Sequence, residues 1–565
     1  MVPRSCCLCG SEHGSIIELR GASVDKYFPQ RRELCQDEHP DEKKAAMSTA
    51  ETRDSAGEYS PLFGPKLALL TFALAISSFM EILDMTIVNV SIPSIAGSLA
   101  VSPSEGTWAI SSYMLAAAVM QPLTGWIGRR FGEVRTFVTS VLLFVLFSAL
   151  CGLATSMPML IVGRLIQGLV SGPMMSLTQA LLLRNYPPNR RGLALGLWAM
   201  TVIVAPICGP IMGGWITDNL SWPWLFFINI PVGLLSAFAT WSILRHREST
   251  IVNQPIDAWG MALLVVGVGS LQFALDNGNE KDWLSSPEIV VAFCTSIVAL
   301  TFLVVWEIGD KHPVVDLHLF ARRNFWVGCV ALSTAYFCFM GANVVFPLWL
   351  QTTLGYTSTW SGFALAPTGV LAVFLAPIIG RNLHRLNLRL TATVAFVILG
   401  ANFYWVSGLN ETASYQQLAL PRLWQGLGMP MFFLPINQII MSGVAPAELA
   451  AAAGLSNFIR TISGSISTAV CVYLWNSRAD VHHAILSEHI RNGSPGLALA
   501  HSQLAVHHIV GTRAYAYVDQ LATQQAMTWA ARDLYWILAL TILAMTPLIW
   551  LSKPPFGAPN AANVH

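Results

Sequence analysis

Two five-residue stretches decide the fold of this chain: RLIQG at Arg164–Gly168 and RLWQG at Arg422–Gly426. Each places a guanidinium deep inside a long apolar run, and the two lie 258 residues apart. A third apolar run contains LDMTIVNV at residues 83–90, with the carboxylate of Asp84 inside it. A charge at the centre of a bilayer costs roughly 3 kcal/mol even on lenient insertion scales, so such residues are candidates for function. The pattern predicts a membrane protein with an internal repeat.

The composition supports a polytopic membrane protein. The chain has 565 residues, of which 54% are hydrophobic and 11% charged, whereas a soluble domain usually carries about 25% charged residues. The formal net charge of +1 gives no indication of nucleic-acid binding. Cys6 and Cys9 have a CxxC spacing, but no second ligand pair follows at zinc-site distance, so no metal site is expected.

Fourteen apolar stretches are close to the roughly 20 residues that a helix needs to cross the hydrocarbon layer. Helices are required there because backbone polar groups cannot stay unpaired in lipid. The fold class predicted is therefore an all-α membrane protein with fourteen transmembrane helices. The stretches cover residues 66–88, 107–127, 134–154, 157–183, 193–216, 224–244, 258–275, 288–307, 325–350, 360–380, 390–409, 417–442, 450–475 and 533–552.

Lys and Arg predict the orientation in the membrane. The short connections on one side hold only Lys281. By the positive-inside rule the arginine-rich side, and with it both termini, is cytoplasmic. The connections after the second, fourth, sixth, eighth and tenth stretches hold Arg129, Arg130, Arg135, Arg184, Arg190, Arg191, Arg245, Arg247, Lys311, Arg322, Arg323, Arg381, Arg385 and Arg389.

Matching residues recur at one slowly drifting offset, which defines the domains. Asn89 matches Asn343, Thr107-Trp108 matches Thr359-Trp360, Gly125 matches Gly380, and Arg164 matches Arg422. Stretches 1–6 and 9–14 are thus two related halves, as in a major facilitator fold with a substrate path between the halves. The predicted parts are a polar, disordered N-terminal tail (1–65), the N-terminal half (66–244), an inserted helix pair (258–307), the C-terminal half (325–552) and a cytoplasmic tail (553–565). The first 46 residues are alternatively residues ahead of a later start at Met47.

The first stretch carries a mostly polar stripe at steps of three or four: Ser77, Glu81, Asp84, Val88 and Ser91. Such a stripe must face the protein interior or a wet cavity. A carboxylate that alternates between a nearby cation and apolar surroundings takes up and releases a proton. We expect Asp84 to couple proton movement to transport and Glu81 to share that role. The alternative is a permanent salt bridge that only holds helices together.

Three arginines are predicted to be buried within the spans: Arg164, Arg422 and Arg460. An arginine keeps its charge at working pH, so each needs an interior acceptor or an anionic ligand. Arg164 is the first candidate for direct proton exchange, and bracing of helix packing is the alternative for all three.

Two glycine-rich segments are candidates for gating. The fifth stretch contains Gly209, Pro210, Gly213 and Gly214, which give a bendable helix with a flat face for close packing. The second ends at the cytoplasm with Gly125, Arg129, Arg130, Gly132 and Arg135, a tight turn with arginines that can pair with carboxylates or helix C-termini. A plain topology signal is the alternative for these arginines.

Residues 66–552 resemble the drug:proton antiporters of the major facilitator superfamily, in the fourteen-span branch of the EmrB/QacA type. Residues 83–93 look like the branch's first-span motif, and Arg164–Gly168 like the fourth-span motif implicated in proton transfer. Residues 125–135 resemble the loop motif, with Gly128 where many members carry Asp. Residues 209–214 look like the fifth-span antiporter motif, with Ala205 in place of an expected Gly. The resemblance implies an inner-membrane exporter that works with a periplasmic adaptor and an outer-membrane channel.

The function predicted is proton-driven export of amphipathic toxic compounds, with membrane lipids as surroundings, no enzymatic activity, no ATP and no cofactor. No G-x-x-x-x-G-K-[ST] phosphate loop is present. A dedicated exporter of one metabolite or siderophore, a transport-inactive sensor or scaffold, and a membrane enzyme are the alternatives. The residues expected to line the substrate cavity are Tyr113, Met114, Gln179, Trp198, Asn343, Arg422, Gln425, Gln438 and Arg460.

The outer connection at residues 476–532 is long and holds six of the thirteen histidines. Long connections are usually functional or disordered. Its Ala, Leu and His content predicts short amphipathic helices. We expect a periplasmic docking site for the adaptor, with an inert solvated loop, or metal or pH sensing, as alternatives.

Overall fold

The computed structural model describes residues 60–252, 255, 257–310, 313–489, 497, 500, 502, 504, 506 and 510–556. All regular structure within these ranges is helical, which confirms the predicted all-α class. The predictions for Cys6, Cys9 and most of the N-terminal tail lie outside these residues.

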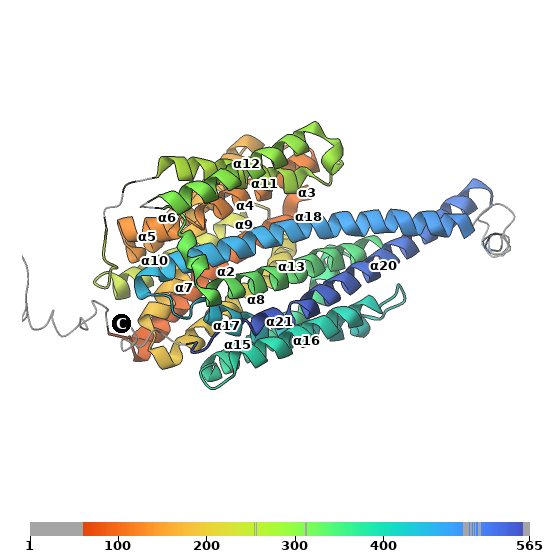
Figure 1. Ribbon diagram of the computed structural model, residues 1–565. Helices are drawn as coiled ribbons and strands as arrows, with labels where there is room; N and C mark the ends of the chain where they lie inside the picture. Colours follow the sequence, from red (N-terminus) through yellow and green to blue (C-terminus); the bar gives the residue numbers. More distant parts are fainter. Residues whose placement is uncertain are drawn as a thin grey trace, which may run out of the picture. The chain divides into compact units, whose positions relative to one another are not determined.

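The N-terminal half is a bundle of six helical regions, three of them interrupted. The first span is α2, and the break between α4 and α5 divides the second (Figure 1). The elements are α2 (Gly64–Ile87), α3 (Ile92–Ser98), α4 (Pro103–Met120), α5 (Thr124–Phe131), α6 (Glu133–Gly152), α7 (Met157–Asn185), α8 (Arg191–Asn219), α9 (Trp224–Phe227) and α10 (Asn229–Leu244).

An inserted pair and a second bundle follow. The pair is α11 (Ala258–Asn277) and α12 (Pro287–Gly309), which pack against each other. The second bundle consists of α13 (Arg323–Thr352), α14 (Ser358–Leu365), α15 (Pro367–Asn382), α16 (Leu388–Ser407), α17 (Tyr415–Ile440), α18 (Leu449–His489), α20 (Thr512–Ala544) and α21 (Thr546–Ile549). Helices therefore occupy all fourteen predicted places.

Twelve helical segments in the described part of the chain are long and apolar enough to cross a membrane. The predicted spans 107–127 and 417–442 fall short of that measure, so the fourteen-span count stays a prediction. The helix α17 has too low a hydropathy because it carries several polar side chains. Three of them, Arg422, Gln425 and Asn437, are buried in the protein. The second span is divided because the helix breaks at Gln121–Leu123.

The outer connection differs from the expectation of a loop with short helices. α18 runs without interruption through 41 residues, and α20 through 33. At 1.5 Å per residue, α18 is about 60 Å long, roughly twice the hydrocarbon thickness. Both helices extend beyond the other helices at one end of the bundle (Figure 1). Hydropathy ends near residue 475, but no Gly or Pro stops the helix there, and the paired helix α20 supports its continuation.

The extension of α18 and α20, residues 476–489 and 512–532, is held by polar contacts. Arg478 Nη2 and His482 Nε2 lie 2.7 Å and 2.8 Å from Asp533 Oδ2. His483 Nε2 lies 3.1 Å from Asp519 Oδ1. The histidines at 501, 507 and 508 lie outside the described residues.

The two halves meet along two pairs of helices, and the internal repeat relates one pair to the other. α8 packs on α15, where a Cβ at Gly196 would touch the carbonyl of Ala376 and one at Gly380 would touch the carbonyl of Gly192. α5 packs on α18, where a Cβ at Gly125 would overlap Ala451. In each pair, the fifth span of one half packs on the second span of the other half. This arrangement is the one expected of two related halves.

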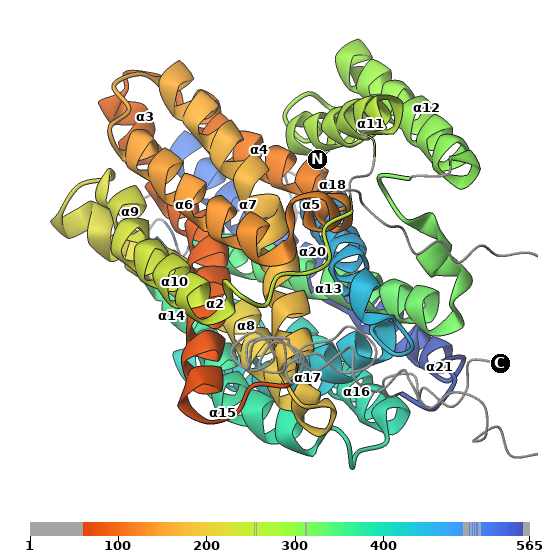
Figure 2. The ribbon, with the colours of Figure 1, turned by 90° about the vertical axis from the view of Figure 1, so that its left-hand side faces the viewer.

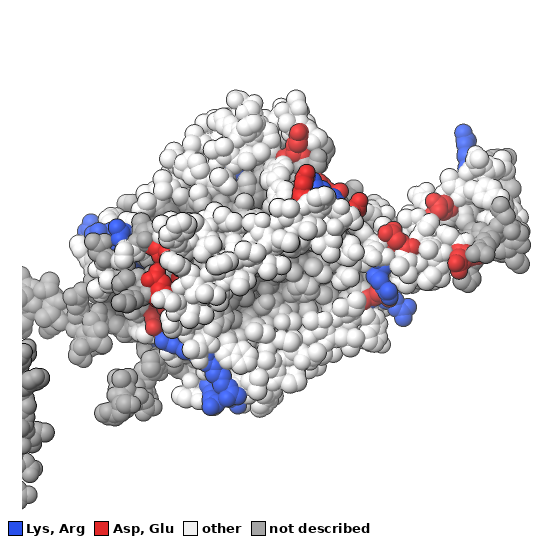
Figure 3. Space-filling model, turned by 45° about the horizontal axis from the view of Figure 1, so that its top comes forward, with Lys and Arg blue, Asp and Glu red and all other residues white. Residues whose placement is uncertain are grey.

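Charged side chains gather toward the two ends of the face drawn in Figure 3, and the surface between them is almost free of them. Large apolar side chains are exposed on several helices of the bundle, among them Leu146 on α6, Phe302 on α12 and Phe374 on α15. An apolar band between charged ends is the surface expected of a protein that crosses a bilayer.

Candidate functional site

Asp84 and Arg164 form a buried ion pair in the N-terminal half. Arg164 Nη1 donates to Asp84 Oδ2 over 2.5 Å, and neither side chain has any exposed surface. Asp84 lies in the last turn of α2, and Arg164 lies near the start of α7. Two charges are stable inside a protein only where their other polar atoms also find partners.

The remaining oxygens and nitrogens of the pair are largely satisfied. Asp84 Oδ1 accepts hydrogen bonds from Asn229 Nδ2 over 2.7 Å and from Gln167 Nε2 over 3.4 Å. Arg164 Nε donates to the carbonyl of Ala109 over 2.9 Å, and its Nη1 also donates to Gln167 Oε1 over 2.9 Å. The carboxylate is therefore held by donors from two helices besides its own.

Asn229 and Ser148 belong to this site although sequence reasoning did not select them. Asn229 is the first residue of α10, and its Nδ2 also donates to Ser148 Oγ over 3.0 Å. Both side chains are buried. The available signal was an amide alone in the apolar stretch 224–244, a position where a buried donor needs an acceptor.

Tyr113 connects the ion pair to the space between the halves. The guanidinium of Arg164 lies 4.1 Å from the centroid of its ring, within cation–π range. The close approach of α4 and α7 depends on Gly168, because a Cβ there would clash with the carbonyl of Tyr113.

A small cavity of about 100 Å³ lies between the two halves. Among the described residues that line this cavity, Glu81 is the only acidic and Arg460 the only basic one. Glu81 Oε2 lacks a hydrogen-bond partner there, and Arg460 Nη2 lies 2.8 Å from Met175 Sδ. The lining residues are Glu81, Ile82, Met85, Tyr113, Met114, Ala117, Gln121, Met175, Val202, Tyr336, Met340, Arg460, Thr461, Gly464, Ser465 and Thr468.

Three of the nine residues predicted for the substrate cavity line this space: Tyr113, Met114 and Arg460. Two others lie in the packed contact between the halves. Gln179 exchanges hydrogen bonds with Asn437 and Asn457 over 3.3–3.4 Å, and Trp198 packs on Phe433 with ring centroids 5.6 Å apart. Asn343 is half-buried in α13 and is not part of this lining.

Arg422 occupies the repeat-related position in the C-terminal half, but with neutral partners. Its Nη1 donates to Gln425 Oε1 over 2.7 Å, and its Nη2 to the hydroxyl of Tyr535 over 3.0 Å. Its guanidinium lies 3.7 Å from the ring centroid of Phe346. The offset that pairs Asn89 with Asn343 places Cys338 opposite Asp84, so this half has no corresponding carboxylate. Arg422 and Gln425 therefore form a separate buried cluster away from the predicted cavity.

Arg184 forms a latch between the arginine-rich ends of the two halves, because it pairs with a carboxylate of its own half and donates to a carbonyl of the other half. Arg184 Nη1 lies 2.8 Å from Glu133 Oε2, and its Nη2 donates to the carbonyl of Pro446 in the C-terminal half over 2.9 Å. Gly128, where the resemblance led us to look for an aspartate, instead packs near Glu133 Cγ. Glu133 supplies the carboxylate of this latch from the next helix.

Gly132 makes the turn between α5 and α6 with a φ of +92°. Residues with a side chain rarely adopt this conformation. The turn also leaves room for Glu248, whose carboxylate accepts from the backbone of Val134 and Arg135 over 2.9 Å and 3.0 Å. A carboxylate at a helix N-terminus is stabilised by unpaired N–H groups and the helix dipole. Arg129 and Arg130 occupy the last turn of α5.

The fifth-span glycines pack α8 against α2 beside the ion pair. A Cβ at Gly209 would overlap Thr86, and a Cβ at Gly213 would overlap the carbonyl of Ile87. Pro210 lies on the side of α8 that faces α14 of the other half, and Gly214 is buried. The predicted flat packing face is thus present, on the helix that contacts both the span of Asp84 and the opposite half.

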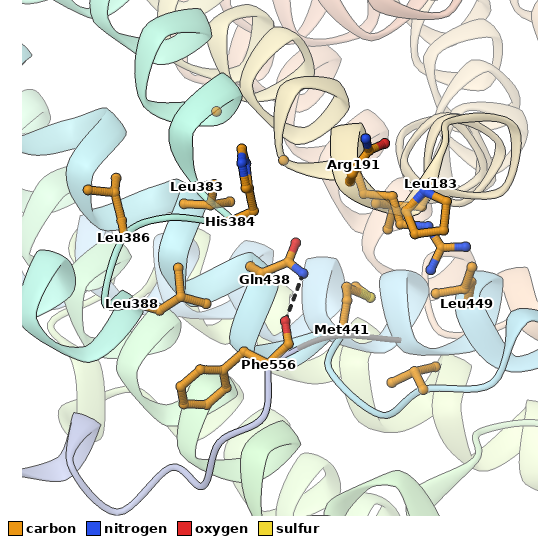
Figure 4. Close-up of a pocket in the computed structure, with 15 residues that line it drawn as sticks. Leu183, Arg191, Leu383, His384, Leu386, Leu388, Gln438, Met441, Leu449 and Phe556 are labelled. Atoms are coloured by element: carbon orange, nitrogen blue, oxygen red, sulfur yellow. Dashed lines mark hydrogen bonds between the residues drawn. The ribbon is translucent and has the colours of Figure 1, made fainter. Parts of the chain in front are cut away.

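A second cavity of about 370 Å³ lies at the arginine-rich ends of both halves (Figure 4). Asn189, Arg191 and Gly192 come from the N-terminal half, and His384 and Gln438 from the C-terminal half. Gln438 Nε2 donates to the carbonyl of Phe556 over 3.2 Å. The structure thus places Gln438 at this end of the interface and not in the cavity that contains Glu81.

Comparison with known proteins agrees with this architecture. Residues 74–468 match the family described as Major Facilitator Superfamily. The human organic anion transporter MFSD10 covers 85% of this chain and is covered completely, with a TM-score of 0.52 and 12% identity. The POT family transporter PepTSo covers 87%, with a TM-score of 0.52 and 15% identity. These solved structures support the fold alone.

The chain belongs to the major facilitator superfamily. Within it, the chain is 46% identical over 505 residues to the multidrug export protein EmrB of Haemophilus influenzae, covering 89% of this chain and 99% of the relative. EmrB of Escherichia coli K12 is 46% identical, with 89% and 98% covered. The fatty acid resistance protein FarB of Neisseria gonorrhoeae is 43% identical, with 88% and 98% covered. The EmrB-type resemblance inferred from the motifs is confirmed.

Proposed function

We propose that this chain is a proton-coupled multidrug exporter that moves amphipathic toxic compounds out across the inner membrane. One observation carries the proposal: Tyr113 lines the cavity between the halves and also lies on the guanidinium of Arg164. A ligand in the cavity therefore touches a side chain that supports the buried ion pair. The similarity to EmrB proteins over nearly the whole chain agrees with export of several compounds.

The proton step is assigned to Asp84. Protonation of its carboxylate removes the negative charge that holds Arg164, while Arg164 itself keeps its charge. A buried cation without its counter-ion is unfavourable, so the helices that carry the two residues rearrange. Glu81 lies one turn away on α2 and lines the cavity, where it shares the proton or meets the polar part of a substrate.

The walls of the cavity fit amphipathic molecules with varied shapes. Met85, Met114, Met175 and Met340 provide flexible, polarisable surface, and Tyr113 and Tyr336 provide rings. Methionine-rich surfaces repack around different ligands, which favours a broad substrate range. The cavity is small in this conformation, so a drug-sized ligand needs the halves to move apart.

The test is proton flux in proteoliposomes with a panel of amphipathic compounds. The unaltered chain is expected to move protons when substrate is added on the appropriate side of an imposed pH gradient. Asp84→Asn keeps the size and most hydrogen bonding of the side chain but cannot release a proton. It is expected to bind substrate and to show no substrate-dependent proton movement. Normal drug-induced proton movement in this variant would remove Asp84 from the mechanism.

A dedicated exporter is the second candidate, favoured by the 43% identity to a fatty acid resistance protein. The same panel separates the two. Proton movement with chemically unrelated compounds supports multidrug export, whereas movement with long-chain carboxylates alone supports the dedicated exporter.

The arginine-rich ends are assigned to the cytoplasm, with both termini on that side. Reporter fusions after residues 130, 190, 246, 385 and 553 are expected to give cytoplasmic signals, and a fusion near residue 500 a periplasmic one. A cytoplasmic signal near residue 500 would exclude this arrangement.

The extension of α18 and α20 is assigned to a periplasmic adaptor protein, which passes substrate to an outer-membrane channel. A helical pair that extends past the membrane offers a stable surface for such a partner. Replacing residues 480–528 by a short Gly/Ser linker is expected to preserve transport in proteoliposomes and to abolish whole-cell resistance and adaptor co-purification. Whole-cell resistance that survives the replacement would contradict the docking role.

A further inference from the structure

A groove of about 530 Å³ opens on the outer surface of the N-terminal half, near its arginine-rich end and apart from the cavity between the halves. It lies among α5, α6 and α7, whose ends are adjacent in Figure 2. The residues that line it are Met120, Ile127, Arg130, Phe131, Arg135, Thr136, Thr139, Ser140, Leu143, Leu169, Val170, Pro173 and Ile251.

One end of the groove is polar and positively charged. Thr136 is only 8% exposed, and its Oγ1 has no hydrogen-bond partner among the described residues. A buried hydroxyl without a protein partner is available to a ligand or a water molecule that enters the groove. Arg135 lies 3.9 Å from Glu248 and its side chain is 61% exposed, so most of its donors face the surroundings. Arg130 lines the same end, with its guanidinium 5.7 Å from the centroid of the Trp126 ring.

The other end of the groove is apolar and continues into the lipid-facing surface. Leu143 of α6 and Leu169, Val170 and Pro173 of α7 form its floor. Large side chains further along the same two helices are exposed: Leu142, Leu146, Val162 and Leu165. A ligand that enters from the membrane can therefore lie along these helices with its polar part beside the arginines.

We infer that the groove binds an anionic phospholipid, which in the orientation proposed above belongs to the cytoplasmic leaflet. Two guanidiniums and a buried hydroxyl match a phosphate that carries a net negative charge, because arginine donates to phosphate oxygens in pairs. The apolar floor matches an acyl chain, which a free phosphate would not occupy. Basic pockets between transmembrane helices on this side are suited to such headgroups.

The connection after α10 links this groove to the latch that Glu133 and Arg184 form between the halves. The connection after α10 runs across the ends of these helices (Figure 2), and Val252 N donates to the carbonyl of Arg129 over 2.8 Å. Glu248 in the same connection caps α6 directly after Gly132. A lipid headgroup on Arg130 and Arg135 thus contacts the turn that leads to Glu133, the carboxylate of the latch.

The binding test is native mass spectrometry of the full chain in detergent, titrated with phosphatidylglycerol or phosphatidylcholine. The unaltered chain is expected to bind its first phosphatidylglycerol about tenfold more tightly, since each arginine near an anionic lipid contributes appreciably. The Arg130→Gln/Arg135→Gln variant is expected to lose this preference. Arg381→Gln/Arg385→Gln is the control, because it removes equal charge at the related loop of the other half, outside the groove.

Two further variants keep the net charge unchanged. Thr136→Val removes the unpartnered hydroxyl and is expected to weaken the preference two- to threefold, roughly the effect of one modest hydrogen bond. Leu143→Trp fills the apolar floor and is expected to weaken phosphatidylglycerol binding while leaving the arginines in place. Circular dichroism and gel filtration of each variant verify that it is folded.

Three results would overturn the inference. Equal affinity of the unaltered chain for the two lipids would show that the groove does not select charge. Equal loss in the control pair would show a general effect of surface charge. Displacement of the lipid by millimolar inorganic phosphate would show a site for a free anion and not for a phospholipid.

Discussion

Asn229 donates a hydrogen bond to the carboxylate of Asp84 over 2.7 Å, and it reaches there from the first turn of α10. The same amide donates to Ser148 on α6. Asn229 therefore fixes the position of the carboxylate that faces Arg164. It is a positioning residue, because nothing places it in contact with the cavity that contains Glu81.

Asn229→Ala is expected to slow transport and to destabilise the protein. A hydrogen bond to a charged group contributes about 1.5–3 kcal/mol, so the free energy of unfolding should fall by roughly that amount. The measurements are the thermal midpoint in detergent and substrate-dependent proton flux in proteoliposomes. Asn219→Ala is the control, since Asn219 is exposed and, among the described residues, its amide donates only to a carbonyl of its own helix. Equal effects of both substitutions would contradict the positioning role.

Arg164→Lys is expected to abolish transport, whereas Arg422→Lys is expected to reduce it only in part. A lysine lacks the planar guanidinium group. It therefore cannot donate to Asp84 and to the carbonyl of Ala109 at the same time while also contacting the ring of Tyr113. Arg422 has no carboxylate partner, so a lysine there leaves no buried anion unpaired. Proton flux at matched expression levels measures both. Equal loss of proton flux in the two variants would contradict this difference between Arg164 and Arg422.

The burial of Asp84 and Arg164 was predictable from sequence, because a carboxylate and a guanidinium inside apolar stretches each need a polar partner. The sequence did not show that the two residues pair with each other. The neutral partners of these charges were not predictable. An amide such as that of Asn229 is less unfavourable in an apolar stretch than a charge, so its presence there is a weak signal. The same limit applies to the cavity. Tyr113, Met114 and Arg460 line it, but Gln179 and Trp198 are taken up by packing between the halves, which depends on how the two bundles meet.

The helix boundaries show a similar division. Each of the fourteen apolar stretches coincides with a helix, because a long apolar segment can enter lipid only with its backbone hydrogen bonds satisfied internally. The same signal stops near residue 475, whereas α18 continues to His489 because its polar residues pair with α20. Hydropathy therefore gave the end of the apolar segment and not the end of the helix.

Gly196→Val is expected to push apart the arginine-rich ends of the halves. A Cβ at this position meets the carbonyl of Ala376, a backbone atom that cannot turn aside. Spin labels at 189 and 386, which lie on opposite halves beside the cavity of Figure 4, should report a longer distance. Gly309→Val is the control, since no atom lies within 4 Å of the added Cβ. An unchanged distance in the first variant would show that this contact does not close the interface.

Residues 551–556 cross the arginine-rich end of the C-terminal half and are held by side chains from several helices. Asn324 pairs with the backbone of Lys553 in both directions, over 2.8 Å and 2.7 Å. Arg389 donates to the carbonyl of Ser552, and Gln438 to that of Phe556. The segment therefore joins α13, α16 and α17 beside the cavity between the halves.

Removal of residues 552–565 is expected to lower the free energy of unfolding by about 2–6 kcal/mol, from four hydrogen bonds with a net contribution of about 0.5–1.5 kcal/mol each. It should also widen the distance between labels at 189 and 386, because Gln438 loses its partner at the cavity. Removal of residues 557–565 alone is the matched control, since it leaves every one of these contacts in place. Thermal unfolding in detergent and the label distance measure the two effects. If both truncations lower stability equally, the contacts of residues 552–556 do not hold these helices together.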